Sequence, residues 1–220
     1  MRKITEEDKL KLLLNLLYEI SSKYDEILEE NKILIEKLAK EAKTDFLTGL
    51  FNRKGLIEEL AKEFERIKRG VDKNLCLAIL DLDNFKKIND NYGHLDGDKV
   101  LTEVGNILRR NLRKYDIYGR WAGDEFLIGI VECKDFDNPQ VCKNCPIYGR
   151  IQKEITDLDR KYRVDFGASV GVSKVPQEGL DLDVVIKKAD ERLYLSKNCG
   201  KHKIVTPENE EEIEKRCKSF

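Results

Sequence analysis

The sequence lacks the features that would tie it to a membrane or to a polyanion. No apolar stretch approaches the roughly 20 residues that a membrane-spanning helix needs, and the first residues lack the unbroken apolar core of a secretory signal. An excess of one charge is also missing, because 41 Lys and Arg residues balance 42 Asp and Glu residues and leave a net charge of -1. No overall field therefore attracts nucleic acid or anionic lipid. We expect a cytoplasmic protein whose partners bind at local sites.

The composition is that of a folded domain with a sizeable core. Hydrophobic residues make up 40% of the 220 residues and charged residues 38%, which suits one core with an accessory segment rich in surface helix. The six cysteines are expected to be free thiols, because the cytosol keeps cysteines reduced.

Three of these cysteines, Cys133, Cys142 and Cys145, are close together in the sequence. The C-x-x-C spacing of the last two turns two thiolates toward one point and invites a structural zinc ion. Zinc prefers four ligands, and no fourth ligand is obvious, although Cys199 and His202 are candidates. Free thiols are the simpler alternative.

The N-terminal segment, residues 1–42, carries a heptad pattern. Its core-facing positions recur in steps of three and four: Leu10, Leu13, Leu17, Ile20, Tyr24, Ile27, Asn31, Leu34 and Leu38. A polar Asn31 on such a seam is typical of parallel two-stranded coiled coils, where it fixes register. We therefore expect a dimeric coiled coil. The alternative is an amphipathic helix folded back on its own domain, because further leucines and isoleucines widen the apolar face.

Residues 43–206 are expected to form one compact α+β domain. The expected elements are a helix over 52–70, a strand over 75–81, helices near 85–91 and 97–112, strands over 116–121 and 125–131, an irregular stretch, a helix over 147–161, a strand over 164–172, a helix over 182–197 and a last strand near 203–206. This order contains the split βαβ pattern, with a central mixed and mainly antiparallel sheet flanked by helices. Residues 207–220 are expected to be a charged, frayed tail or at most a helix.

Acidic residues stand at the ends of two expected strands. Asp81 follows the apolar run 75–80, and Asp124 and Glu125 precede the run 126–131. In the split βαβ pattern these two strands are antiparallel neighbours, so the three acids should meet. Crowded carboxylates are relieved by a divalent cation, and Mg²⁺ suits ligands that are all oxygen. Lysines that could meet phosphate oxygens are Lys86, Lys197 and Lys201.

Five short motifs follow one another through the domain. They are DFLTGLFNR at 45–53, DLDNFKKIND at 81–90 with Gly93-His94 and Gly97-Asp98 behind it, AGDEF at 122–126, SVGV at 169–172 and a closing helix from Ala189-Asp190 to Lys201. In this order and spacing they closely resemble the GGDEF family of diguanylate cyclases. The resemblance spans nearly the whole domain and implies a palm-like GGDEF fold preceded by the N-terminal helix.

The resemblance implies a reaction between two GTP molecules, one held by each subunit of a dimer. Cyclic di-GMP would be formed and pyrophosphate released twice. Asp81, the Leu82 carbonyl and Asp124 would hold two Mg²⁺ ions, and Asp124 or Glu125 would help to deprotonate the attacking hydroxyl. This is two-metal stabilisation of an in-line displacement.

The resemblance also implies a set of substrate contacts. The terminal phosphates would meet the backbone amides of Phe85 and Lys86 and the side chains of Lys86, Lys197 and Lys201. Asn89 and Asp98 would read the donors of guanine. His94 either lies near the base or closes its loop.

A further site is implied by Arg113 and Asp116, which match the family's R-x-x-D inhibitory site, five residues before the AGDEF motif. Taken alone, this pair is an ordinary ion pair at a helix end. Its register favours binding of the product, cyclic di-GMP.

Two positions depart from the family pattern. Ala122 replaces the first glycine of the signature, which the turn accepts if the backbone there keeps a negative φ. Lys201 stands where arginine is common and loses its bidentate geometry. The rival hypothesis is a catalytically weak module that senses cyclic di-GMP without making it.

Overall fold

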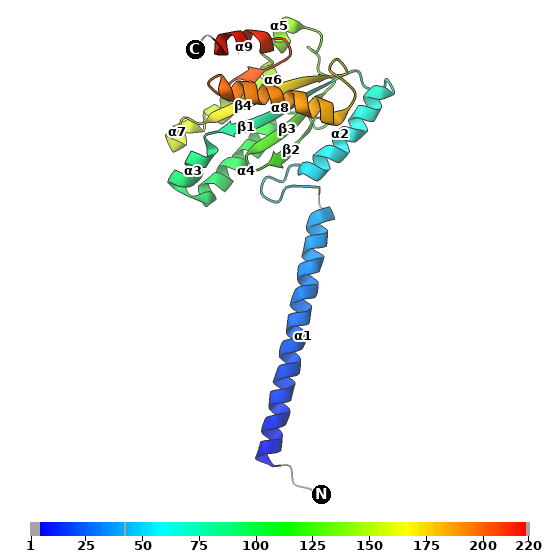
Figure 1. Cartoon of the computed structure of the whole chain (residues 1–220), viewed down its shortest axis with the longest axis vertical. Coiled ribbons are helices and arrows are strands. Elements are labelled where there is room, and N and C mark those ends of the chain that lie inside the picture. Colours follow the sequence, from blue (N-terminus) through cyan, green and yellow to red (C-terminus); the bar gives the residue numbers. More distant parts are fainter. Residues whose placement is uncertain (1–4, 42, 219–220) are drawn as a thin grey trace. The chain divides into compact units, whose positions relative to one another are not determined.

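The chain divides into two units, residues 1–42 and 43–220, in a computed structural model that describes residues 5–41 and 43–218. The first unit is one helix, α1 (Glu6–Glu41), drawn in blue in Figure 1. Its apolar side chains are open to solvent, for example Leu13, Leu17 and Ile20 at 57%, 61% and 64% exposure. No helix in the described part of the chain has the length and apolar character needed to cross a bilayer.

The second unit contains the remaining helices and strands. In chain order they are α2 (Arg53–Lys68), β1 (Leu75–Asp83), α3 (Phe85–Tyr92), α4 (His94–Asn111), β2 (Ile117–Ala122), β3 (Glu125–Val131), α5 (Pro139–Cys142), α6 (Pro146–Thr156), α7 (Asp159–Tyr162), β4 (Gly167–Val175), α8 (Leu182–Asn198), β5 (Ile204–Val205) and α9 (Glu210–Cys217). The strands form one sheet in the order β2-β3-β1-β4-β5. All neighbours are antiparallel except β4 and β5.

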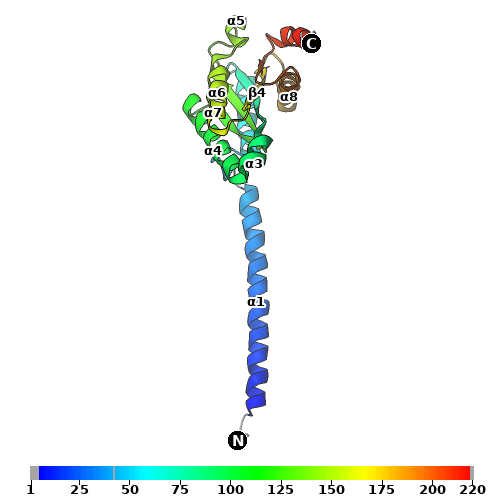
Figure 2. The same ribbon diagram turned by 90° about the vertical axis from the view of Figure 1, so that its left-hand side faces the viewer.

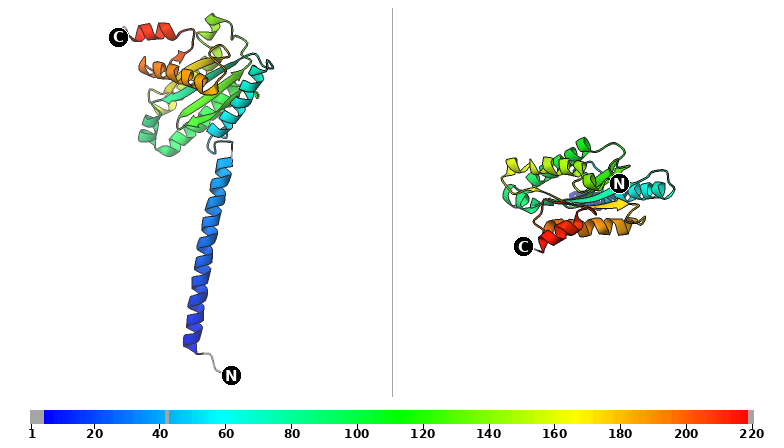
Figure 3. Two further views of the ribbon diagram at one scale, coloured as in Figure 1. Left: turned by 45° about the vertical axis from the view of Figure 1, so that its right-hand side comes forward. Right: turned by 90° about the horizontal axis from the view of Figure 1, so that it is seen from above.

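Side-chain alternation on the central strand β1 explains why helices cover both faces of the sheet. Leu77 and Ile79 pack in a cluster with apolar side chains of α2 and α8. Ala78 and Leu80 point the other way, into a cluster with α3, α4 and α6. The opposite sides taken by α8 and by α4 and α6 are visible in Figures 2 and 3. Every residue of β1 is buried, as expected for a strand with helices on both faces.

The predicted α+β class and the split βαβ arrangement are confirmed. The antiparallel register sets Asp81 opposite Glu125, which is the meeting of strand ends that the topology predicts. The helix expected over 147–161 is instead two helices, α6 and α7, with Asp157 and Leu158 between them. The strand expected over 164–172 begins at Gly167 and runs to Val175.

The prediction that all six cysteines are free thiols is wrong for two of them. Cys199 and Cys217 form a disulfide that joins the end of α8 to the end of α9. The pattern gives no sign of this pairing, because Cys217 lies in the charged C-terminal segment, where the sequence predicts a frayed tail or at most a helix. In the structure α9 is also tied to the domain by an ion pair between Glu210 and Arg192, 2.9 Å apart.

Candidate active site

The carboxylates that end β1 and begin β3 lie side by side. Asp81 is paired with Glu125 across the two strands. The Leu82 N–H donates to the Asp124 carbonyl at 3.4 Å, so the tip of the β2–β3 hairpin lies against the end of β1. The sheet itself therefore brings these acids together.

The tip of that hairpin is a tight turn through Gly123. Gly123 has φ +50°, in the left-handed region that glycine favours. Ala122 lies outside that region and is paired with Glu125, so its methyl group brings no backbone strain. The Arg120 side chain stabilises this turn, because its Nε donates a hydrogen bond to the Gly123 carbonyl at 2.7 Å.

The negative charge of the three acids at this site is only partly compensated by positive charge. Burial raises the pKa of Asp81 to about 6, and the charges of Asp124 and Glu125 push it in the same direction. Lys197 opposes this shift, with its Nζ 2.7 Å from Asp81 Oδ2. Burial also raises the pKa of Glu125. Bringing a cation to these carboxylates would relieve the unfavourable charge.

An open hollow next to the acids collects most of the residues expected to bind phosphate. Its walls are Asp81, Leu82, Asp83, Asn84, Phe85, Lys86, Lys87, Asp90, Asp124, Lys197 and Lys201. The start of α3 faces this hollow, and the Asn84 side chain makes no capping hydrogen bond to its first turn. Backbone N–H groups of a first helical turn attract anions. The hollow thus combines a helix start and the ammonium groups of four lysines with the carboxylates of Asp81 and Asp124, which suit a metal.

The sequence reasoning missed Asp83 and Asn84, which lie in the wall of this hollow, and Ser169, which contacts Asp83. Asp83 is buried and its carboxylate accepts hydrogen bonds from the Ser169 hydroxyl, at 2.9 and 3.0 Å, and from the His202 N–H, at 3.1 Å. Asn84 takes a left-handed turn with φ 61° and accepts a hydrogen bond from Lys201 Nζ at 3.1 Å. The available signal was alternation, which puts Asp83 on the same face of β1 as Asp81.

A second hollow adjoins the first and collects the residues expected at the guanine base. It is lined by Phe85, Lys86, Asn89, His94, Asp98, Leu101, Arg120, Gly123 and Asp124. Gly97 makes room for this arrangement, because a Cβ there would lie 1.9 Å from Asn89 Oδ1. The two hollows share Phe85, Lys86 and Asp124. One ligand could therefore reach from the helix start to the paired acids.

The donor set fits magnesium, provided that the substrate completes it. Within residues 5–41 and 43–218, no three Asp, Glu, His or Cys side chains are grouped closely enough to form a metal site by themselves. Mg²⁺ is ordinarily held by one or two carboxylates together with phosphate oxygens and water. Asp81 and Asp124, with the carbonyl of Leu82, offer that incomplete oxygen set beside the lysine-lined hollow.

The two residues of the expected product site are used differently in the structure. The carboxylate of Asp116 is buried and accepts the N–H of Arg113, at 2.7 Å, and of Val131, at 3.2 Å. Burial raises the pKa of Asp116 against these two hydrogen bonds. The Arg113 guanidinium donates to the Tyr115 hydroxyl at 2.9 Å, at the exposed surface. Asp116 holds the loop together, while Arg113 is accessible to a ligand.

The zinc site predicted from Cys133, Cys142 and Cys145 does not form. Among the described residues no group of three metal-binding side chains converges there. The sulfurs have separate partners: Cys142 donates to the Asp135 carbonyl at 2.9 Å, and Cys133 is hydrogen-bonded to Cys76. Cys199, a candidate fourth ligand, is in the disulfide.

Comparison with known sequences gives one consistent family. The model of the diguanylate cyclase GGDEF domain matches residues 42–203. Diguanylate cyclase DgcP of Escherichia coli is 34% identical over 183 residues, which cover 83% of this chain and 50% of DgcP. Cyclic di-GMP phosphodiesterase NbdA of Pseudomonas aeruginosa is 37% identical over 166 residues, 75% of this chain and 20% of NbdA. The chain thus spans half or less of the length of these relatives.

Solved structures agree. The coiled coil and GGDEF domain of DgcB from Caulobacter crescentus, in complex with c-di-GMP, has a TM-score of 0.64 at 27% identity, over 87% of this chain and 98% of that one. Diguanylate cyclase SiaD of Pseudomonas aeruginosa, in complex with its activator SiaC, has a TM-score of 0.64 at 31% identity, over 91% and 75%.

Proposed function

The chain belongs to the GGDEF family of diguanylate cyclases, and on that premise we propose that it joins two GTP molecules into cyclic di-GMP and releases two pyrophosphates. The observation that carries this proposal is the meeting of two hollows at Asp124, one lined with lysines and the other with the guanine-reading candidates. A nucleotide that spans both would bring its α-phosphate to the paired acids.

The acids would act on the attacking 3′-hydroxyl. A general base needs a raised pKa to hold a proton at the working pH, and burial raises the pKa of Glu125 above its usual value. Glu125 or Asp124 would accept the hydroxyl proton as the new phosphate ester bond forms. Lys86, Lys197 and Lys201 would hold the pyrophosphate that leaves.

Asp81, Asp124 and the Leu82 carbonyl would hold two Mg²⁺ ions together with phosphate oxygens. When bound, the metal supplies positive charge where negative charge develops on the transferred phosphate. Lys197, now paired with Asp81, would be released toward a phosphate group. The chain's own contribution is to hold these groups in place before the nucleotide arrives.

Selection of guanine is assigned to Asn89 and Asp98, which line the second hollow. A carboxylate accepts hydrogen bonds from N1–H and the exocyclic amine of guanine, whereas adenine does not present this pair of donors. His94 lies in the same wall.

Two copies of the chain are needed, because each would supply one GTP to the reaction. The solvent-exposed heptad seam of α1 supports a parallel coiled-coil dimer, since a row of leucines gains stability when a second helix covers it. Deleting residues 1–40 should lower turnover about tenfold or more at low protein concentration, because association becomes limiting. Leu17→Asp on the seam, compared with Glu19→Gln off it, gives a matched pair for sedimentation. Equal dimerisation and turnover in all of these proteins would exclude this role for α1.

Product feedback is part of the proposal, with Arg113 as the accessible group of the R-x-x-D site. Placement in the cytoplasm, where GTP is available, stays a prediction.

The experiment that tests the function is incubation of the full chain with GTP and Mg²⁺, followed by mass analysis of the nucleotide product. Cyclic di-GMP with two pyrophosphates per product is the expected result. Binding of cyclic di-GMP without its synthesis would instead support the sensor hypothesis.

A further inference from the structure

A small pocket with four thiols lies near the start of β1, away from the hollows that hold the acids. Its volume is about 50 Å³, and its walls include Cys76, Cys133, Cys142, Cys145, Tyr148 and Lys174. A single water needs only roughly 10–15 Å³ by this kind of measure, so a molecule the size of hydrogen peroxide fits. The proposed cyclase reaction uses none of these side chains.

Asn74, two residues before Cys76, binds the backbone of the segment that contains Cys133. The Glu132 N–H donates to the Asn74 carbonyl at 2.9 Å, and the Cys133 N–H donates to the Asn74 side chain at 2.7 Å. These bonds continue the contact between β1 and β3 beyond the end of β3. The side chains of Cys76 and Cys133 interact, and both line the pocket.

Cys133 is the thiol best prepared to react. The hydrogen bond from Cys76, the backbone N–H of Asp135 and the charge of Lys174 outweigh burial and the Asp135 carboxylate, and they lower the pKa of Cys133 to about 7. Cys133 is partly exposed, whereas Cys76 is buried. The same hydrogen bond and burial raise the pKa of Cys76. The pair thus combines an accessible thiolate with a neighbouring protonated thiol, the arrangement found in redox-sensing cysteines.

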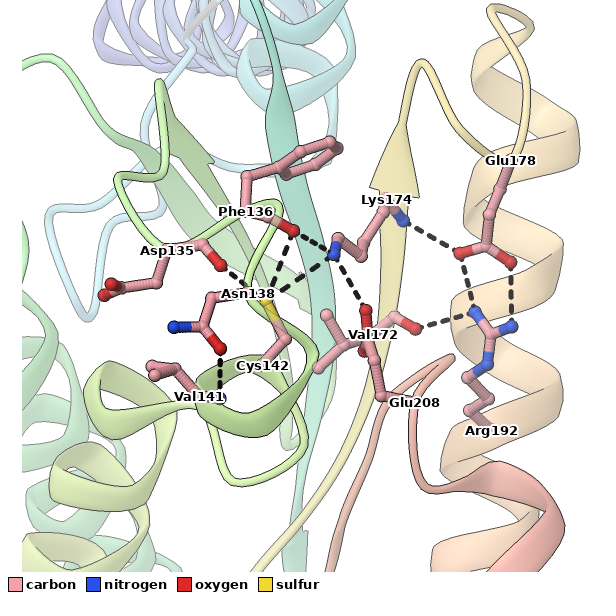
Figure 4. Close-up of polar contacts among 10 residues, drawn as sticks. All are labelled: Asp135, Phe136, Asn138, Val141, Cys142, Val172, Lys174, Glu178, Arg192 and Glu208. Atoms are coloured by element: carbon pink, nitrogen blue, oxygen red, sulfur yellow. Dashed lines mark hydrogen bonds and ion pairs between the residues drawn. The ribbon is translucent and has the colours of Figure 1, made fainter.

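The other two thiols of the pocket are held in unreactive forms. Burial raises the pKa of Cys145 to about 11. Burial also raises the pKa of Cys142, although Lys174 Nζ lies 3.5 Å from its sulfur. Burial outweighs the lowering effect of Lys174 on this thiol. Figure 4 shows that the Lys174 ammonium group is shared between the Cys142 sulfur, the Glu208 carboxylate and the Phe136 carbonyl.

We propose that Cys133 and Cys76 are a reversible oxidation site for a hydroperoxide, with Cys133 as the attacking thiolate and Cys76 as the resolving thiol. The Cys133 sulfur attacks one peroxide oxygen, the S–O bond forms, the O–O bond breaks and hydroxide leaves. The Cys76 sulfur then attacks the sulfur of the resulting sulfenic acid, the S–S bond forms as the S–O bond breaks, and the hydroxyl group leaves as water with the Cys76 proton. The peroxide gains two electrons and the two thiols lose two. A dithiol reductant reverses the step by thiol–disulfide exchange.

The size of the expected difference between the thiols follows from their acidity. The pKa of Cys133 is lowered and that of Cys145 is raised, so Cys133 carries the larger thiolate fraction at pH 7. The weaker intrinsic nucleophilicity of the more acidic thiol offsets part of this advantage. Cys133 should therefore react with iodoacetamide at pH 7 at least about tenfold faster than Cys145.

The test treats the full chain, free of added reductant, with hydrogen peroxide in the presence and absence of dimedone and maps the digested peptides by mass. A Cys76–Cys133 linked peptide that a dithiol removes is expected in the parent protein. Cys76→Ser should instead accumulate the dimedone adduct at Cys133. Cys145→Ser, a change in the same pocket, should leave the linked peptide unchanged.

Three results would overturn the proposal: no Cys76–Cys133 link after peroxide is consumed, labelling of Cys145 as fast as that of Cys133, or loss of the link in Cys145→Ser. The first two are measured on the parent protein, so they do not depend on the folding of any variant. They also do not depend on cyclase activity, and the proposal stands or falls separately from the proposed function.

Discussion

The contact between β1 and β4 buries one ionisable side chain near each of its ends. The surroundings disfavour the charged form of the side chain at one end and favour the charged form at the other. At one end Asp81 lies opposite Ser169, and burial raises its pKa to about 6. At the other end Lys174 lies opposite Cys76, and its bond to Glu208 raises its pKa although burial alone would lower it. Charge is therefore disfavoured on Asp81 and favoured on Lys174.

The difference separates a carboxylate whose negative charge is only partly compensated from an ammonium group whose positive charge is well compensated. Asp81 has Lys197 as a partial counter-charge but stands beside two further acids. Lys174 is 3% exposed, and its ammonium group is hydrogen-bonded to Glu208 and to the Phe136 carbonyl (Figure 4). Strained electrostatics of the first kind are common in functional sites. The second kind holds the fold together.

The largest expected effect is on catalysis at the Asp81 end. Asp81→Asn should lower the rate of cyclic di-GMP formation by at least about a thousandfold, because the amide removes a proposed metal ligand from the transition state. Its melting temperature should stay the same or rise, because the amide carries no buried charge. Asp157→Asn, at an exposed pair with Arg160, is the control and should keep full activity. A fully active Asp81→Asn would contradict the active site.

The Lys174 end should respond in the opposite sense. Lys174→Met should cost about 3 kcal/mol of unfolding free energy, because it leaves the Glu208 carboxylate and the Phe136 carbonyl buried without their partner. The rate per folded molecule should change little. Lys187→Met, at an exposed pair with Glu191, should cost about 0.5 kcal/mol or less. Denaturant unfolding measures the loss of stability in both variants, and initial rates measure their activity. An equal loss of unfolding free energy in the two variants would contradict the structural role of Lys174.

The arrangement of the acidic end could be predicted from the sequence in more detail than that of the thiol end. Asp81, Asp124 and Glu125 belong to strand ends whose meeting follows from the topology, so their pattern carries three-dimensional information. The partner of Cys133 is Cys76, more than fifty residues earlier, and no local spacing connects them. The C-x-x-C spacing drew attention to Cys142 and Cys145 instead.

Buried positioning groups were hidden for a related reason. Asp83 and Ser169 meet only because β4 pairs with β1, and a single acid in a motif does not indicate whether it binds a ligand or a neighbouring strand. The disulfide between Cys199 and Cys217 joins two helix ends, a contact that helical periodicity does not specify. The sequence pattern could predict the order of the elements and the residues that lie at the same end of the sheet.

The pH dependence of stability gives a smaller effect that sharpens the comparison. The pKa of Asp81 rises from 3.8 to about 6 on folding, so this group favours the folded state below pH 4 and loses that contribution as the pH rises to about 6. The loss amounts to about 2 kcal/mol. Without Mg²⁺ or nucleotide, Asp81→Asn should therefore gain stability relative to the parent between pH 4 and pH 6. If the difference in melting temperature between the two proteins did not change over this pH range, burial would not raise the pKa of Asp81. Added Mg²⁺ with GTP should reduce the difference in stability.

The smallest expected effect concerns product feedback near the thiol end, where Asp116 binds the N–H of Val131 at the end of β3. Because the Asp116 carboxylate is buried and already holds two backbone groups, recognition of a cyclic dinucleotide at this site falls mainly to the Arg113 guanidinium. Arg113→Ala should leave initial rates similar and weaken inhibition by added cyclic di-GMP about tenfold, because one or two charge-assisted hydrogen bonds to phosphate or guanine are lost.

Lys114→Ala, one residue away and exposed, is the matched control for a general loss of positive charge. Rates measured with increasing product, together with calorimetric titration, distinguish the two. Equal inhibition in the parent and in Arg113→Ala would assign the R-x-x-D sequence to loop structure alone, as the buried position of Asp116 would then suffice to explain it.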